Sequence, residues 1–135
     1  TVTLGDNVVT NISCAGQQQS CEYIEIIAGD HLTADIYGGT HNYALRYADL
    51  YTGESATVNW NCDYQYSCRQ VEWDLGNQST FNLTCNGRES CYDIDLSSGN
   101  DSIIDIWAAG QDGFELATVH AFDAASFHLE CDSGT

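Results

Sequence analysis

Six of the seven cysteines in this chain stand in three pairs at nearly the same spacing. The pairs are Cys14 with Cys21, Cys62 with Cys68, and Cys85 with Cys91. Regular cysteines without CxxC motifs or histidines at zinc spacing indicate disulfide bonds, each closing one short loop, and an oxidising compartment. A structural zinc site is the competing interpretation, although zinc prefers tighter ligand spacings. Cys131 has no mate, because its expected partner would follow Thr135.

Four carboxylates recur at intervals of 23 or 24 residues: Glu25, Asp49, Glu72 and Asp95. If equivalent residues stack, neighbouring charges repel by about 1 kcal/mol per pair in water. The sequence favours a solvated acidic face on which the side chains splay apart. The alternative prediction is a calcium-binding row, because a row of oxygen ligands suits Ca²⁺, which would relieve this repulsion. We expect no other cofactor.

Four Asn-x-Ser/Thr sequons predict N-linked glycans: Asn11, Asn77, Asn82 and Asn100. Asn11 and Asn82 stand between apolar positions of alternating segments, where a side chain would face outward. Asn77 and Asn100 each follow a glycine in a predicted turn. The competing explanation is that asparagine suits turns and outward strand positions without carrying a sugar.

Two tyrosines, Tyr64 and Tyr66, lie in the loop between Cys62 and Cys68. Exposed aromatic rings stack on sugars or pack against another subunit, so we expect these tyrosines to contact a glycan or a partner. Ordinary loop tyrosines are the competing interpretation.

The residues that could catalyse a reaction are scattered. The four histidines are scattered over different coils and faces, and no spacing places a nucleophile beside a base and an orienting group. The chain contains three Lys and Arg residues in all, so the cations that a polysaccharide lyase would use are scarce. We therefore do not expect an enzyme.

A repeat that extends through nearly the whole chain positions these residues. The segment VNWNCDYQYSCRQVEWDLG (residues 58–76) recurs as FNLTCNGRESCYDIDLSSG (81–99) and, earlier, as TNISCAGQQQSCEYIEIIAG (10–29). Steps of 23 or 24 residues connect one apolar row, Ile12, Ile36, Trp60, Leu83, Ile106 and Leu129. The same steps connect a second row, Ile26, Leu50, Trp73, Leu96 and Val119. A period of this length is typical of solenoid proteins, whose repeats stack.

Alternation of apolar and polar residues within each repeat predicts β-strands. Stacked repeats would place equivalent strands side by side in parallel sheets, about 4.8 Å apart. We therefore predict an all-β fold: a parallel β-helix of about six coils, each of 23–24 residues, with disulfides inside the coils. Residues 1–135 should form a single solenoid domain. Both ends fall in the middle of a coil, which predicts a longer chain or a filament.

The coil length and the inward apolar rows resemble right-handed parallel β-helices. The Cys-loop-Ser-Cys motif, with Ser20, Ser67 and Ser90 before the second cysteine, is similar to cysteine-rich solenoid repeats of large extracellular proteins of algae and other protists. The resemblance covers nearly the whole chain, and it implies a structural role outside the cell.

The net charge of -17 argues against a nucleic-acid partner, since such binding depends on Lys and Arg at phosphates. The sequence has no run of 18 apolar residues, so we expect no membrane span. We expect an extracellular or cell-surface structural module that assembles with itself, head to tail or laterally, into a filament, surface appendage, wall or coat. The alternatives are a carbohydrate-binding or adhesin module and, less favoured, a polysaccharide lyase-like enzyme.

Overall fold

The structure is a computed structural model, and it describes residues 1–16, 18–122 and 126–132. These residues form two parallel sheets of six strands each. Sheet A contains, in spatial order, β1 (Val2–Leu4), β3 (Glu25–Ala28), β5 (Asp49–Thr52), β7 (Glu72–Leu75), β9 (Asp95–Ser98) and β11 (Thr118–Ala121). Sheet B contains β2 (Val9–Ser13), β4 (Thr33–Tyr37), β6 (Thr57–Cys62), β8 (Thr80–Cys85), β10 (Ile103–Ala108) and β12 (Ser126–Cys131).

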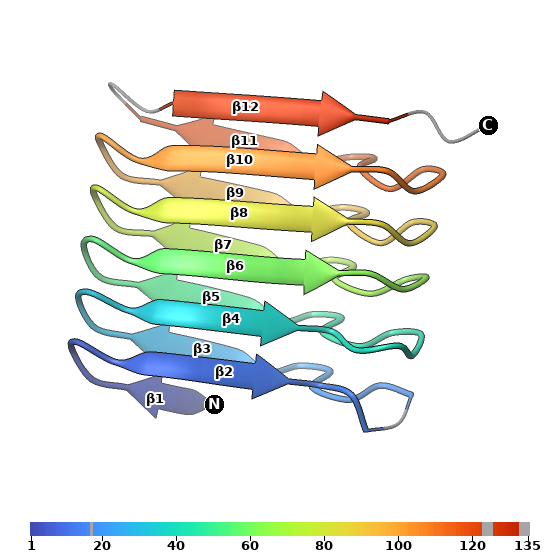
Figure 1. Ribbon diagram of the computed structural model, residues 1–135, viewed down its shortest axis with the longest axis horizontal. Helices are drawn as coiled ribbons and strands as arrows, with labels where there is room; N and C mark the ends of the chain where they lie inside the picture. Colours follow the sequence, from blue (N-terminus) through green and yellow to red (C-terminus); the bar gives the residue numbers. More distant parts are fainter. Residues whose placement is uncertain (17, 123–125, 133–135) are drawn as a thin grey trace.

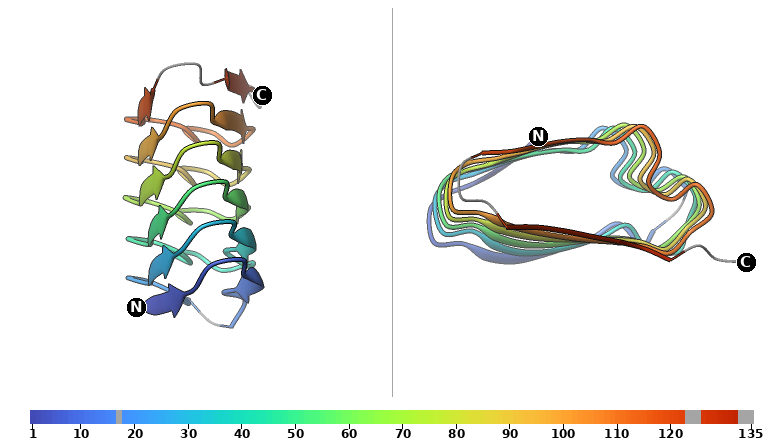
Figure 2. Two further views of the ribbon diagram at one scale, coloured as in Figure 1. Left: turned by 90° about the vertical axis from the view of Figure 1, so that its left-hand side faces the viewer. Right: turned by 90° about the horizontal axis from the view of Figure 1, so that it is seen from above.

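The chain winds as a right-handed coil. The strands of sheet B run from left to right in front, the strands of sheet A return behind them, and each coil lies above the previous one (Figure 1). Seen along the axis, the coils superimpose as a flattened ring whose two long sides are the sheets (Figure 2). Strands β2 to β11 make five complete coils, and β1 and β12 each add half a coil. The predicted fold class, an all-β parallel solenoid, is confirmed.

The strand register matches the repeat. In sheet B the predicted apolar row is continuous, with each residue beside its equivalent in the next coil: Ile12, Ile36, Trp60, Leu83, Ile106 and Leu129. In sheet A the second row is also continuous: Ile26, Leu50, Trp73, Leu96 and Val119. Both predicted rows are therefore columns that run through the stack.

The core is a single narrow layer between the sheets. Trp60 of sheet B meets Trp73 of sheet A edge to face, with 5.3 Å between the ring centroids, and the ring of Phe81 lies 5.1 Å from that of Trp73. All three side chains are fully buried. Aromatic pairs of this kind contribute about 0.5–1.5 kcal/mol beyond the burial of their area, so they hold the sheets together at mid-stack.

The turn from sheet A to sheet B brings the backbones of successive coils into contact. A Cβ atom added at Gly76 would overlap the carbonyl group of Gly53, its equivalent in the previous coil. In the same turns Asp30 Oδ1 accepts a hydrogen bond from the backbone N–H of Glu54, at 2.8 Å. Glycine is therefore required here because no side chain fits between the stacked turns.

The longer connection, from sheet B to sheet A, forms a corner with an unusual backbone. One row of equivalent residues is left-handed in every complete coil, with φ between 55° and 59°: Tyr23, Tyr47, Gln70, Asp93 and Leu116. The N–H groups of the first four donate to carbonyl oxygens of the next coil, as from Tyr23 to Arg46 and from Tyr47 to Arg69, both at 3.0 Å. The backbone hydrogen bonding therefore continues from the sheets into the corner.

Three disulfides close this corner within single coils. They join Cys14 to Cys21, Cys62 to Cys68 and Cys85 to Cys91, with Cα–Cα distances of 5.6, 5.8 and 5.9 Å. These are the pairs that the spacing predicts. In the two complete coils without cysteines, Leu45 is fully buried and Phe114 packs against the core at the corresponding place. An apolar side chain thus fills the space of the absent disulfide. None of the described residues belongs to a helix long and apolar enough to cross a membrane.

Candidate functional site

The candidate sites lie on the outer faces of the two sheets, at the corner and along the open edges of the stack. No pocket forms among the residues that the structure describes. Within the same residues, no group of three or more His, Cys, Asp or Glu side chains is arranged to hold a metal ion.

The predicted carboxylate row lies on the outer face of sheet A. Glu25, Asp49, Glu72 and Asp95 are paired in register, and the row ends at Thr118. Burial raises the pKa of Asp49 and the carboxylate of Glu25 raises it further, against the effect of a backbone hydrogen bond at Glu72. Like charges therefore face one another along this row. The calcium site stays a prediction.

A second outward row lies on sheet B and pairs donors with acceptors. Asn82 Nδ2 donates to Asn59 Oδ1 at 2.8 Å, and Asn59 Nδ2 donates to Asp35 Oδ1 at 2.7 Å. Further along, His128 Nδ1 lies 2.9 Å from Asp105 Oδ1. The hydrogen bond to Asp105 and the charge of Asp105 raise the pKa of His128. Each of these contacts joins equivalent residues of neighbouring coils, 23 or 24 residues apart in the sequence.

The four sequon asparagines differ in accessibility. Asn11, Asn77 and Asn100 are exposed, whereas Asn82 is half-buried within the amide row. Asn77 also holds the turn, because its Oδ1 accepts a hydrogen bond from the backbone N–H of Asn100 at 2.9 Å. Glycosylation at these positions stays a prediction.

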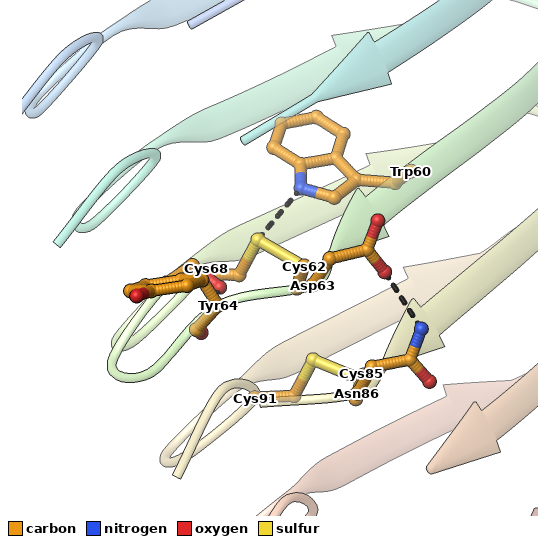
Figure 3. The surroundings of a disulfide bond; sticks show 9 residues. Trp60, Cys62, Asp63, Tyr64, Cys68, Cys85, Asn86 and Cys91 are labelled. Carbon is orange, nitrogen blue, oxygen red and sulfur yellow. Dashed lines mark hydrogen bonds between the residues drawn. A yellow bond between two sulfur atoms is a disulfide. The ribbon is translucent and has the colours of Figure 1, made fainter. Parts of the chain in front are cut away.

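The disulfide corner combines sulfur, aromatic and polar side chains. The indole N–H of Trp60 points to Cys68 Sγ at 3.1 Å (Figure 3). Cys62 lies directly beside Cys85 in the next coil, so two disulfides stack one above the other (Figure 3). Next to them, Asn86 Nδ2 donates to Asp63 Oδ1 at 2.7 Å. The corner is therefore packed in register like the sheets.

Tyrosines of successive coils stack at this corner. The rings of Tyr23 and Tyr47 are 4.8 Å apart and inclined by 11°, and those of Tyr43 and Tyr66 are 5.3 Å apart and inclined by 9°. Of the predicted contact residues, Tyr66 has one face covered by Tyr43, while Tyr64 is 45% exposed. The sequence contained the signal for both stacks, since each pair is separated by one repeat.

All three arginines of the chain lie at the same corner. The guanidinium of Arg46 lies 5.4 Å from the ring centroid of Tyr43 and 4.5 Å from that of Tyr47. It also approaches Glu22 to 3.9 Å. Arg69 lies over the ring of Tyr92 and Arg88 approaches Glu89. The corner thus concentrates the few positive charges among aromatic rings, which attract cations.

The last coil exposes residues that belong to the core rows. Phe127 is 44% exposed and Leu129 is 39% exposed, whereas Ile104 and Ile106, their neighbours in β10, are fully buried. At the opposite end Ile12 is only partly buried. Cys131, beside Ala108 in the register, is exposed and free.

These features define the chain as a right-handed, disulfide-containing parallel β-solenoid with stacked tyrosines at one corner. No protein-family model, curated protein or solved structure matches the chain.

Proposed function

We propose that this chain is a structural module: a disulfide-stapled, N-glycosylated length of β-solenoid in an extracellular filament, surface appendage, wall or coat. The observation that carries the proposal is that the described coils present the same two core rows in register, so that an equivalent coil fits on each of them. A further coil of the same kind can stack in this way, because it supplies both a matching apolar row and a partner strand. Repeated stacking of this kind produces an extended assembly.

Two features support an extracellular location. Disulfides persist in oxidising compartments, and the three exposed sequons would let sugars project into the medium. The Ser-Cys corner supports kinship with the cysteine-rich solenoid repeats of algal and other protist structural proteins. Ser67 and Ser90, one residue before the second cysteine, are fully buried there, which gives a packing reason for the small residue in the motif.

The net charge opposes contact between copies. Two chains that each carry a charge of -17 repel one another, and added salt screens that repulsion. We therefore expect end-to-end association to strengthen as ionic strength rises.

The test is association of residues 1–135 in oxidising buffer, followed by sedimentation at several concentrations and by electron microscopy. We expect the wild type to form end-to-end oligomers. The double variant Phe127→Arg, Leu129→Arg places charge on the open edge and should stay monomeric. Trp107→Arg is the matched control, because Trp107 is also exposed but lies on the outer face of sheet B.

The proposal fails if the wild type remains a monomer at every concentration and salt level. It also fails if the double variant associates as well as the wild type. If Trp107→Arg prevents association to the same extent, the contact lies on the sheet face, and the stacking proposal is wrong.

A carbohydrate-binding or adhesin module is the second candidate. The observation that favours it is the exposure of the Tyr64 and Tyr23 rings at one corner, since such rings stack on sugars. Glycan-array binding that is lost in Tyr64→Ala or Tyr66→Ala, and retained in Tyr37→Ala on the outer face of sheet B, would favour this function.

A further inference from the structure

The stacked pair Tyr23 and Tyr47 joins neighbouring coils through side chains that have their own chemistry. Their rings are nearly parallel, with centroids 4.8 Å apart. Tyr23 is 68% exposed, so an oxidant in the medium can reach it, while Tyr47, in the next coil, is half-buried against it. The pair therefore combines an accessible phenol with a second phenol held against it.

Neighbouring groups hold the inner ring of this pair. Arg46 Nη2 donates a hydrogen bond to the phenol oxygen of Tyr47 at 2.5 Å, and its guanidinium lies over the Tyr47 ring. The backbone N–H of Tyr23 donates to the carbonyl oxygen of Arg46. Tyr47 is thereby fixed, and the backbone that carries Tyr23 is tied to the same coil.

No described side chains form a covalent link between coils. Each of the three disulfides closes a loop within its own coil, with sequence separations of 7, 6 and 6 residues. Side-chain cohesion between coils therefore rests on packing, hydrogen bonds and ion pairs such as Arg46 with Glu22. A bond between Tyr23 and Tyr47 would be of a different kind, because it would join one coil to the next.

We propose that Tyr23 and Tyr47 form a dityrosine cross-link when a peroxide-dependent one-electron oxidant acts on the folded protein. Each phenol loses one electron and its hydroxyl proton and becomes a phenoxyl radical. The two radicals couple through a new bond between ring carbons ortho to the oxygens, and the two ortho hydrogens then move to the oxygens. The two electrons and two protons released reduce one hydrogen peroxide to two waters.

Proximity decides which tyrosines react together. Radicals on two stacked rings meet within one molecule, whereas radicals on separate molecules must meet by diffusion. The other stack, Tyr43 with Tyr66, is wider and both rings are half-buried, so we assign the first bond to Tyr23 and Tyr47. The inference needs only one folded copy and does not depend on the proposed assembly.

The experiment treats dilute wild-type protein with a haem peroxidase and hydrogen peroxide and isolates the monomer by size. We expect dityrosine fluorescence, a mass loss of two hydrogens and a protease fragment in which the Tyr23 peptide is joined to the Tyr47 peptide. The cross-linked monomer should melt at a higher temperature than the untreated protein.

Three variants make the assignment specific. Tyr23→Phe and Tyr47→Phe keep an aromatic ring in the stack but remove one phenol, so each should lose the joined fragment. Tyr64→Phe is the matched control, because Tyr64 is also exposed at the corner, and it should keep the fragment. Circular dichroism establishes that each variant is folded.

The inference is overturned if oxidised wild-type monomer lacks the joined fragment while other tyrosines are visibly oxidised. It is equally overturned if the bond joins other tyrosines in preference, or if Tyr64→Phe loses the fragment as completely as Tyr23→Phe does.

Discussion

The outer faces of the two sheets use the same register in opposite ways. On sheet A the register places Asp49 between two other carboxylates, Glu25 and Glu72, so equivalent residues repel. On sheet B it places Asn59 between Asp35 and Asn82, and each contact joins a donor to an acceptor. The inner faces do not differ in this way, since both consist of apolar columns. In a solenoid, therefore, the interaction between equivalent residues of neighbouring coils is repeated along the whole row, whether it is attractive or repulsive.

The largest expected effect tests whether the inner faces are equivalent. Trp60→Ala on sheet B and Trp73→Ala on sheet A should each destabilise the fold by about 3–5 kcal/mol, because each leaves a cavity in the same narrow core. Chemical denaturation with the disulfides intact measures both. Markedly unequal losses of unfolding free energy would show that the core residues of one sheet contribute more to stability than those of the other.

The next effect comes from turning the sheet B row into an acidic one. Asn59→Asp removes the donor to Asp35 and sets two carboxylates side by side, which should cost about 1 kcal/mol. Asn61→Asp is the control on the same strand, because its register neighbours are Tyr37 and Thr84. If both variants lose the same unfolding free energy in denaturation experiments, the amide row does not contribute to stability.

A smaller effect comes from neutralising the sheet A row. Glu72→Gln should raise stability by about 0.5–1 kcal/mol at low salt, since it removes repulsion from Asp49 and Asp95. If calcium binds the row, Ca²⁺ should raise the melting temperature of the wild type more than that of this variant.

Asp74→Asn is the control for the sheet A row, because its register neighbours are Tyr51 and Ser97. It should respond to Ca²⁺ as the wild type does. A wild-type melting temperature that Ca²⁺ leaves unchanged would contradict the calcium prediction.

The smallest effect concerns the pair on the outer face of the last strands. Because Asp105 raises the pKa of His128, the pair stabilises β12 fully below the ordinary histidine value, about pH 6.5. That stabilisation is lost as the pH rises through the higher pKa of the folded state. NMR titration should therefore show a lower His128 pKa in Asp105→Asn than in the wild type. An unchanged value would mean that the two side chains do not meet in solution.

The features that could be predicted from the sequence are those that depend on the repeat period and on the alternation of residues along each strand. The column through Trp60 and Leu83 follows from these two regularities, and so does the carboxylate row. The disulfide pairs follow from spacing, because each pair of cysteines stands 6 or 7 residues apart within one coil.

The structure of the corner could not be predicted, because its residue types do not indicate its backbone conformation. Leu45, Tyr47 and Leu116 adopt left-handed backbone conformations, which residues other than glycine and asparagine seldom do. Without that backbone the directions of the corner side chains cannot be derived. The place of Arg46 between two tyrosines therefore had to come from the structure, although the one-repeat interval between stacked tyrosines was visible.

The confinement of each disulfide to one coil has a mechanical consequence. When the ends of the stack are pulled apart, the coils should unfold one at a time. The residues inside a disulfide-closed loop cannot extend, so they add nothing to the length gained when that coil unfolds. At roughly 3.5 Å per extended residue, a coil with a disulfide lengthens by roughly 15–20 Å less than one without. Force–extension curves should therefore contain two step lengths, and reduction should merge them into one.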